Sequence, residues 1–215
     1  MSGISQRPGA EEWVPPSGGV AALRRAAPDC RGCELWRDAT QVVFSSGPAR
    51  AAIVLVGEQP GDHEDTAGAP FVGPAGHVLD EALQAAGLDR SDLYLTNAVK
   101  HFRHHDRGKR RIHDTPTVGQ VLACRPWLKA ELDRVRPRVL VCLGATAARS
   151  ALGHPVTVGD MRGKPLAAPE GIRAEAVVVT THPSALLRVR GKPEWDEAFD
   201  ALVADLCAAR ELANR

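Results

Sequence analysis

Short, continuous runs of apolar residues alternate along this chain with longer segments of helical periodicity. We expect strands near 52–56 (AIVLV), 93–97 (LYLTN), 139–143 (VLVCL) and 177–180 (VVVT), and helices near 18–27, 75–86, 117–135, 145–152 and 194–213. Strands that are apolar on both faces are typical of a parallel sheet covered by helices on both sides. The sequence therefore predicts an α/β protein with three layers, α/β/α, and a central, mainly parallel four-stranded sheet.

The composition indicates one ordinary globular domain. Of 215 residues, 44% are apolar and 25% are charged, which suffices for a full hydrophobic core. Residues 1–16 are rich in Gly, Pro and Glu and predict a disordered leader, followed by a single domain over 17–215. No run approaches the roughly 20 apolar residues of a membrane span, and we see no signal peptide. We therefore expect a cytoplasmic monomer that makes no membrane contact.

The segment 100–113 (KHFRHHDRGKRRIH) is strongly basic. Its fourteen residues include six Lys or Arg, four His and one Asp, whereas the net charge of the whole chain is only +1. It is too polar to bury and follows a predicted strand, so we expect a surface loop before the helix near 117–135, for which Thr115 is the expected N-cap. Such a loop is suited to binding a polyanion, although many basic runs are merely solvated surface. It ends at His113, whose imidazole is a possible nucleophile.

Three polar segments follow predicted strands and should share the carboxyl edge of the sheet, where ligands bind in open parallel sheets. They are GEQPG at 57–61, the basic loop after Asn97, and His182-Pro183-Ser184. No GxGxxG or GxxxxGK[ST] follows a strand, which disfavours a dinucleotide or P-loop site. Each polar segment also has a simpler explanation: a tight turn at 57–61, a loop cap at Asn97, and a structural histidine at His182.

One aromatic side chain, Phe71, lies between two glycine-containing turns in the segment PFVGPAG. This position is suited to stacking on a nucleic-acid base, and Asn97 could then read a base edge. Burial in the core is the alternative for Phe71.

The five cysteines favour a metal site over disulfides, because disulfides are rare in the cytosol. Cys30 and Cys33 form a CxxC pair, and Cys124 is a plausible third ligand. A fourth ligand would come from the basic segment, with His101, His104 and His105 as candidates. Such a set could hold Zn²⁺ or a [4Fe–4S] cluster. Cys142 and Cys207 lie on predicted core faces and are expected to be buried thiols.

Taken together, these motifs resemble the uracil-DNA glycosylase superfamily, in particular its family 4 iron–sulfur branch, and most closely the UdgX class. The resemblance spans about residues 18–210. The matching segments, in order, are GEQPGDHED (57–65) with AGAPFVGPAG (67–76), TNAVK (96–100), LGATAA (143–148), MRGKP (161–165) and THPSALLR (181–188). Two departures from ordinary family 4 favour UdgX: His101 stands where a cysteine ligand is usual, and GKRRIH (108–113) is inserted.

The resemblance implies a DNA repair protein that excises uracil from DNA, with single strands favoured, and releases free uracil. It also implies that His113 becomes covalently linked to C1′ of the resulting abasic sugar, and that the protein associates with the nucleoid when it is on DNA. The implied catalytic residues are His113, Glu58, His182, Gln59 and Asp62, and the implied uracil-binding residues are Phe71, Asn97 and Gly57. The implied DNA-binding residues are Lys109, Arg110, Arg111, Lys100 and Ser184. The implied ligands of a [4Fe–4S] cluster are Cys30, Cys33, His101 and Cys124.

Two alternatives stay open at the level of sequence. The first is a conventional family 4 glycosylase with multiple turnovers, in which His113 only contacts phosphate. The second is a non-catalytic, zinc-stabilised nucleic-acid-binding domain that uses the CxxC pair and the basic loop.

Overall fold

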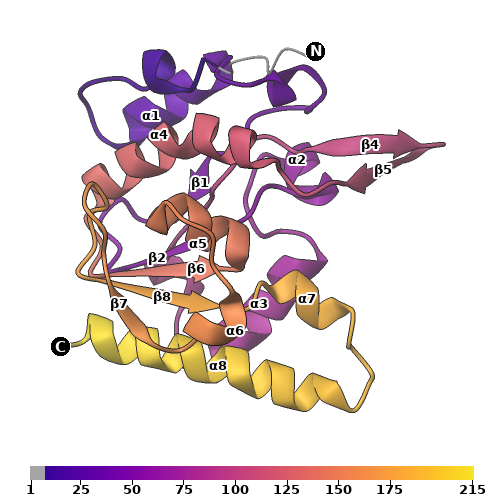
Figure 1. The fold of residues 1–215 in the computed structure, drawn as a ribbon, viewed down its shortest axis with the longest axis vertical. Coiled ribbons are helices and arrows are strands. Elements are labelled where there is room, and N and C mark those ends of the chain that lie inside the picture. Colours follow the sequence, from indigo (N-terminus) through magenta and orange to yellow (C-terminus); the bar gives the residue numbers. More distant parts are fainter. Residues whose placement is uncertain (1–7) are drawn as a thin grey trace.

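A six-stranded sheet forms the centre of the protein, which is described here for residues 8–215 from a computed structural model (Figure 1). The strand order is β1-β3-β2-β6-β8-β7. The four central strands are parallel: β3 (Tyr94–Asn97), β2 (Ile53–Gly57), β6 (Val139–Leu143) and β8 (Ala176–Thr180). These are the four predicted strands, so the α/β fold with a mainly parallel sheet is confirmed. Two short antiparallel edge strands, β1 (Ser45–Ser46) and β7 (Pro165–Ala167), were not predicted, because two or three residues carry no periodic pattern.

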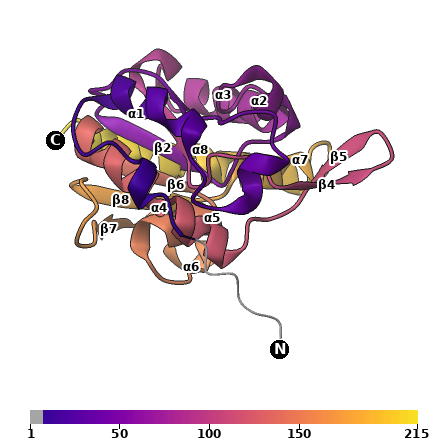
Figure 2. The same cartoon turned by 90° about the horizontal axis from the view of Figure 1, so that it is seen from above.

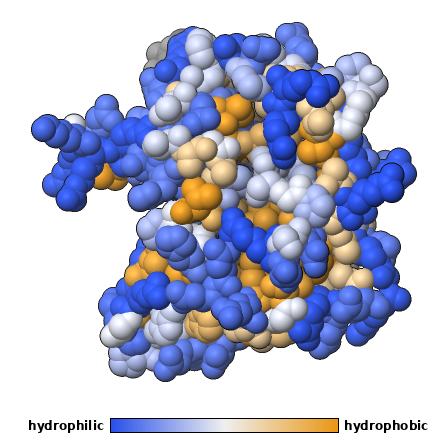
Figure 3. All heavy atoms as spheres, turned by 180° about the vertical axis from the view of Figure 1, so that it is seen from behind, coloured by the Kyte–Doolittle hydropathy of each residue, from blue (hydrophilic) through white to orange (hydrophobic). Residues whose placement is uncertain are grey.

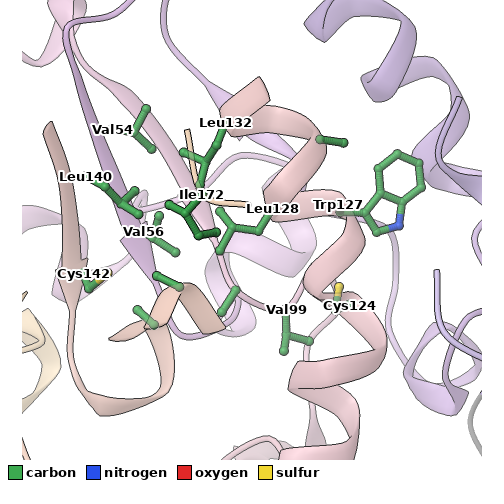
Figure 4. Close-up of a cluster of buried hydrophobic side chains, with 14 of the residues drawn as sticks. Val54, Val56, Val99, Cys124, Trp127, Leu128, Leu132, Leu140, Cys142 and Ile172 are labelled. Atoms are coloured by element: carbon green, nitrogen blue, oxygen red, sulfur yellow. The ribbon is translucent and has the colours of Figure 1, made fainter. Parts of the chain in front are cut away.

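Helices cover both faces of the sheet and complete the three layers (Figures 1 and 2). One core cluster joins alternate strand residues such as Val54 and Leu140 to α1 (Val20–Ala26), α4 (Val118–Val135) and α5 (Ala145–Leu152); Figure 4 shows part of it. The other joins the opposite strand faces to α3 (Pro74–Ala85), α7 (Pro183–Leu187) and α8 (Glu194–Ala213). The remaining short helices are α2 (Asp62–Ala67), α6 (Val158–Met161) and 3₁₀ turns at Glu11–Trp13, Ala27–Asp29, Glu34–Arg37 and Arg90–Asp92.

Helix α4 begins two residues later than the N-cap predicted at Thr115. Thr117 is its N-cap: the Thr117 hydroxyl accepts the backbone N–H of Gln120, and the Gln120 side chain accepts the backbone N–H of Thr117. This reciprocal pair satisfies two backbone donors that a helix start otherwise leaves unpaired. The helix therefore starts at Val118 and continues through Pro126 to Val135.

The basic segment forms a β-hairpin where the sequence predicted a loop. Strand β4 (His104–Arg107) pairs with β5 (Arg110–His113), in register from His104 opposite His113 to Arg107 opposite Arg110. Its tight turn contains Gly108, which has a φ of 64°. Glycine takes up this left-handed conformation without the steric cost of a Cβ. Figure 3 shows the hairpin as a hydrophilic arm that stands away from the body of the protein.

The predicted leader is partly ordered. Residues 1–7 lie outside the described residues, so for them the prediction is untested. From Gly9 onward the chain packs on the domain: Gly9 N–H donates to Gly32 O and Ala10 N–H to Ala123 O, and Ala10 is 1% exposed. Residues 9–14 therefore lie against α4 and the CxxC segment, contrary to the expectation of disorder up to residue 16. Between residues 8 and 215, no helix has the length and apolar character needed to cross a bilayer.

Candidate active site

A large cavity opens at the carboxyl ends of the central strands. It encloses about 1590 Å³ of space, including solvent at its mouth. Eight residues that the sequence predicted to be functional line this cavity: Glu58, Gln59, Asp62, Phe71, Asn97, His113, His182 and Ser184. Gly57 lies behind the cavity wall, next to Asn97 and Phe71. The loops after β2, β3 and β8 and the base of the hairpin therefore converge as expected for an open parallel sheet.

Glu58 links the hairpin to the sheet. One oxygen of its carboxylate, Oε1, lies 3.5 Å from Nε2 of His113. The other, Oε2, accepts a hydrogen bond from the Thr146 hydroxyl at 2.5 Å. The side chain of Glu58 is 23% exposed and that of His113 is 47% exposed. This arrangement fixes the carboxylate where it can orient the imidazole and take a proton from it.

Thr146 is a member of this group that was not predicted. It lies in the first turn of α5, within the LGATAA segment that the sequence comparison noted without assigning it a role. A threonine in a helix carries no chemical signal of its own. Its contact with Glu58 spans 88 positions, and such a contact becomes visible only when the fold is known.

His182 is held as a neutral hydrogen-bond donor. Its Nδ1 accepts the backbone N–H of Ser184 at 3.1 Å and lies 2.8 Å from the Ser184 hydroxyl. Because Nδ1 accepts, the ring proton resides on Nε2. Burial, and after it the charge of His113, lower the pKa of His182 to about 4. The imidazole is therefore neutral near pH 7, with an N–H to offer to a ligand in the cavity. Ser184 positions His182, whereas the sequence suggested a DNA contact.

Phe71, Asn97 and Gly57 meet at the floor of the cavity. Phe71 is 6% exposed and Asn97 is 2% exposed. A Cβ on Gly57 would collide with Asn97 Oδ1 and would lie 2.6 Å from Cζ of Phe71. The ring of Phe71 lies 6.3 Å from that of His182, tilted by 30°. Gly57 therefore leaves the space that the two neighbouring side chains need.

Phe71 has an unusual backbone conformation, with a φ of 56°. This left-handed conformation costs a non-glycine residue about 1–2 kcal/mol, so the surroundings must impose it. The Arg90 guanidinium donates to the carbonyls of Pro70 and Phe71, at 3.2 and 3.0 Å. Glu64 accepts the next two backbone N–H groups, those of Val72 and Gly73. The ring is thus fixed before any ligand binds.

Gln59, Asp62 and Arg111 hold the hairpin in place. The Gln59 amide bonds to backbone on both sides of the hairpin base, at Arg103 and Asp114. The Arg111 guanidinium donates to Asp62 at 2.6 Å and to the fully buried Asp65 at 2.5 Å. Gln59 and Asp62 were predicted to be catalytic and Arg111 to bind DNA. In the structure Gln59 and Arg111 bond within the protein, whereas Asp62 bonds to Arg111 through one oxygen and its side chain is 53% exposed in the cavity wall.

Lys100 is buried, contrary to the expectation that it contacts DNA. It is 1% exposed, forms an ion pair with the buried Glu131, and donates to Thr96 Oγ1 and to the carbonyl of Asn97. Its ammonium group thus supports the end of β3 from behind. Lys109 and Arg110, by contrast, are exposed at the hairpin turn.

A second, smaller cavity brings together the predicted cluster ligands. Cys30, Cys33, His101 and Cys124 line a small space of about 290 Å³, a volume that includes solvent at its mouth. The Trp127 indole donates to Cys30 Sγ at 3.3 Å, and the Lys100 backbone N–H donates to Cys124 Sγ at 3.4 Å. Burial lowers the pKa of His101 to about 4, so the imidazole is neutral, as a ligand must be. Burial raises the pKa of the Cys124 thiol to about 12, so a positive charge is needed to stabilise its thiolate.

The other two candidate histidines lie elsewhere. His104 Nε2 is 3.1 Å from the carbonyl of Asp38, and His105 Nδ1 is 2.9 Å from the Asp114 carboxylate. Among residues 8–215, no three Cys, His, Asp or Glu side chains converge closely enough to hold a single metal ion. Three thiols and a neutral imidazole around one cavity are chemically suited to holding a metal or a cluster. Cys142 is fully buried in β6, as expected, whereas Cys207 is only half-buried on the α8 side of the sheet.

Comparison with known proteins gives a consistent assignment. The model of the uracil DNA glycosylase superfamily matches residues 44–207. The type-4 uracil-DNA glycosylase of Thermotoga maritima is 39% identical over 162 residues, which cover 75% of this chain and 79% of the relative. The corresponding protein of Archaeoglobus fulgidus is 34% identical over 187 residues, covering 85% and 90%. A type-5 uracil-DNA glycosylase of Pyrobaculum aerophilum is 31% identical over 148 residues, covering 62% of each chain. The chain belongs to the uracil-DNA glycosylase superfamily.

Proposed function

We propose that this protein excises uracil from DNA, with a preference for single strands, and remains covalently attached to the product through His113. The observation that carries the proposal is the pairing of His113 with Glu58, 3.5 Å apart, at the mouth of the cavity that also contains Phe71, Asn97 and His182. The family supplies the substrate class, and this pair supplies a nucleophile with its own base.

Uracil has to leave the base stack before its glycosidic bond can be reached, which costs a few kcal/mol and is easiest in single strands. Phe71 stacks on the extruded base, and the Asn97 amide bonds its polar edge. His182 donates its Nε2–H to uracil O2. As the bond from C1′ to N1 breaks, the electron pair moves onto uracil, and a fixed donor at O2 contributes ~3 kcal/mol to stabilising that charge.

Loss of the base leaves an electron-poor C1′. One ring nitrogen of His113 forms a bond to C1′, and the other gives its proton to Glu58. A tethered nucleophile can have an effective molarity of ~10⁵ M, so it captures C1′ ahead of water. The product is a neutral N-alkyl imidazole, which is a poor leaving group. The protein therefore acts once on each uracil and stays bound.

A conventional glycosylase with multiple turnovers is the second candidate. The type-4 names of the relatives favour it, and the 47% exposure of the His113 side chain gives water access to the same region. In that case His113 contacts DNA without forming a bond to it.

A denaturing gel separates the two candidates. Stoichiometric protein is mixed with a labelled single-stranded oligonucleotide that contains one uracil, and the sample is heated in detergent. We expect a shifted band with the parent protein and with His105→Ala, which alters another exposed histidine of the hairpin. No band is expected with His113→Ala or with thymine in place of uracil. Alkali-labile abasic DNA beyond one equivalent of parent protein, without a shifted band, would establish the conventional enzyme instead.

We also propose that Cys30, Cys33, His101 and Cys124 hold a [4Fe–4S] cluster. Three thiols, a neutral imidazole and two N–H donors to sulfur around one cavity support this assignment. When bound, the cluster supplies a rigid cross-link between the N-terminal segment, the end of β3 and α4. Contact with DNA is assigned to Lys109 and Arg110, whose side chains are exposed at the hairpin turn.

A further inference from the structure

A groove on the protein surface continues from the catalytic cavity between α4 and α5. It encloses about 740 Å³, including solvent, and lies between the start of α4, the first turns of α5 and residues 155–157. It shares Thr115, Ala145 and Thr146 with the catalytic cavity. α4 and α5 lie side by side, with the start of α4 toward the hairpin (Figure 1). A polymer whose base enters the cavity can therefore extend directly into the groove.

The chemistry of the groove favours an anion with apolar parts. Its one charged side chain is Arg149, which is half-buried and has no hydrogen-bond or ion-pair partner for its guanidinium anywhere in residues 8–215. No carboxylate is among the groove residues. Val118, which is 48% exposed, and Val156 provide apolar surface beside it. The guanidinium groups of Arg103 and Arg125, which lie nearby in the fold, are by contrast bonded to backbone carbonyls.

We infer that this groove binds the nucleotide adjacent to uracil in the same strand. Its phosphate bonds to Arg149, and its sugar and base lie against Val118 and Val156. The inference rests on the proposed function, because uracil in the catalytic cavity defines which strand continues into the groove. A single DNA strand is the occupant that fits both the continuity of the two spaces and the unpaired cation. A guanidinium forms strong, charge-assisted bonds with a phosphate.

The test uses three single-stranded oligonucleotides, in which uracil has flanking nucleotides on both sides, only on the 5′ side or only on the 3′ side. Uracil removal is measured with protein in excess over labelled DNA, so that both a single-use and a recycling enzyme can be compared. For Arg149→Gln we expect the half-saturating protein concentration to rise roughly tenfold on the two-sided substrate. The rise should also occur on one of the two one-sided substrates, but not on the other. The rate at saturating protein should stay within about twofold.

Two further variants make the test specific. Thr157→Glu adds a negative charge to the groove at an exposed position, and it should weaken binding on the same substrates as Arg149→Gln. Thr157→Gln adds similar bulk without the charge at the same groove position, and it should weaken binding less than Thr157→Glu. Arg50→Gln removes another arginine that has no partner among the described residues; it is exposed just before β2, at the opposite edge of the sheet, and should behave like the parent.

Equal weakening on both one-sided substrates, or none on any substrate, would overturn the inference. Fluorescence anisotropy of the same oligonucleotides gives the affinities independently of chemistry. If the parent removes no uracil, the proposed function fails, and anisotropy still decides whether Arg149 binds one flank. If the parent removes uracil and Arg149→Gln matches it, the groove assignment fails while the proposed function stands.

Discussion

At the scale of single residues, Gly57 has the strongest steric constraint in the catalytic cavity. We expect Gly57→Ala to lower the rate of uracil removal by ~10²-fold, because a methyl group would displace Asn97 or Phe71 from the base. The thermal midpoint should fall as well, because Asn97 and Phe71 are both buried and one of them has to shift. Gly159→Ala is the control, because its Cβ would meet nothing within 4 Å. Equal activity of the two variants would show that the base does not lie on Phe71 and Asn97.

His182 should make the stability of the protein depend on pH. Its pKa is about 4 in the folded protein, because of burial and the nearby His113 charge, and about 6.5 in the unfolded chain. Between these values the unfolded chain binds the proton and the folded protein does not. The free energy of unfolding should therefore fall as the pH drops from 6.5 to 4, by up to ~3 kcal/mol, and be unaffected by this group above pH 6.5.

Denaturant titrations at several pH values check this expectation. His182→Gln should show a flatter decline between pH 6.5 and 4 than the parent. His154→Gln, an exposed histidine outside the cavity, should decline as the parent does. The same slope in the His182 variant and the parent would mean that His182 is protonated as easily in the folded protein as in the unfolded chain.

Several residue roles were not visible in the sequence. Lys100 was expected at the surface, because lysine is seldom buried. Its partner Glu131 lies 31 positions away, so the ion pair appears only when β3 and α4 are packed together. Arg111 was assigned to DNA because its positive charge is evident in the sequence. Its acceptors in the protein, Asp62 and Asp65, lie more than 40 positions away and appear only in the fold. The positions of Asn97 and His182 could be predicted, because the ends of parallel strands share one edge.

At the scale of elements, the hairpin is the part of the structure that the sequence described least well. Its strands are short, exposed and polar, so they lack the alternation that predicts a strand. What stabilises it is a set of contacts to α2 and to the loop after β2. Arg111 bonds to Asp62 and Asp65 and stacks on Phe102, with 5.5 Å between the guanidinium carbon and the ring centre. These contacts hold His113 beside Glu58.

Arg111→Gln should therefore loosen the hairpin. We expect hydrogen exchange of the backbone amides in 104–113 to become roughly tenfold faster, because the anchoring contacts are lost. Covalent product should fall more than uracil release, since His113 would meet C1′ less often. Arg110→Gln, at the exposed end of the hairpin, should leave hydrogen exchange near the parent rate. Unchanged exchange together with a weaker salt dependence of DNA binding would make Arg111 a phosphate contact, as the sequence first indicated.

At the scale of the whole molecule, the two cavities lie at the two ends of one short segment. Residues 97–101 run from Asn97, at the catalytic cavity, to His101, at the cysteine cavity. Lys100 lies between them and bonds to the Asn97 carbonyl and, through its backbone, to Cys124. A cluster that fixes His101 and Cys124 would thereby also fix the end of β3. The long central strands and helices could be predicted from their periodicity, but this side-by-side arrangement could not.

Iron and sulfide analysis tests the cluster. The parent protein should contain about four irons and four sulfides per chain, and Cys33→Ser should lose most of them. Cys207→Ser should retain them, because Cys207 lies on α8, on the other face of the sheet. Removal of iron by an oxidant and a chelator should lower the thermal midpoint of the parent. Zinc without sulfide in the parent would contradict the cluster and favour a zinc-stabilised domain.

The most direct test of the whole account is the intact mass of the protein after incubation with a short oligonucleotide that contains one uracil. The account predicts a single adduct, heavier than the protein by the mass of the oligonucleotide minus uracil, and peptide mapping should place the modification on His113. An unmodified protein mass together with released uracil would contradict the covalent mechanism and leave a conventional uracil-DNA glycosylase.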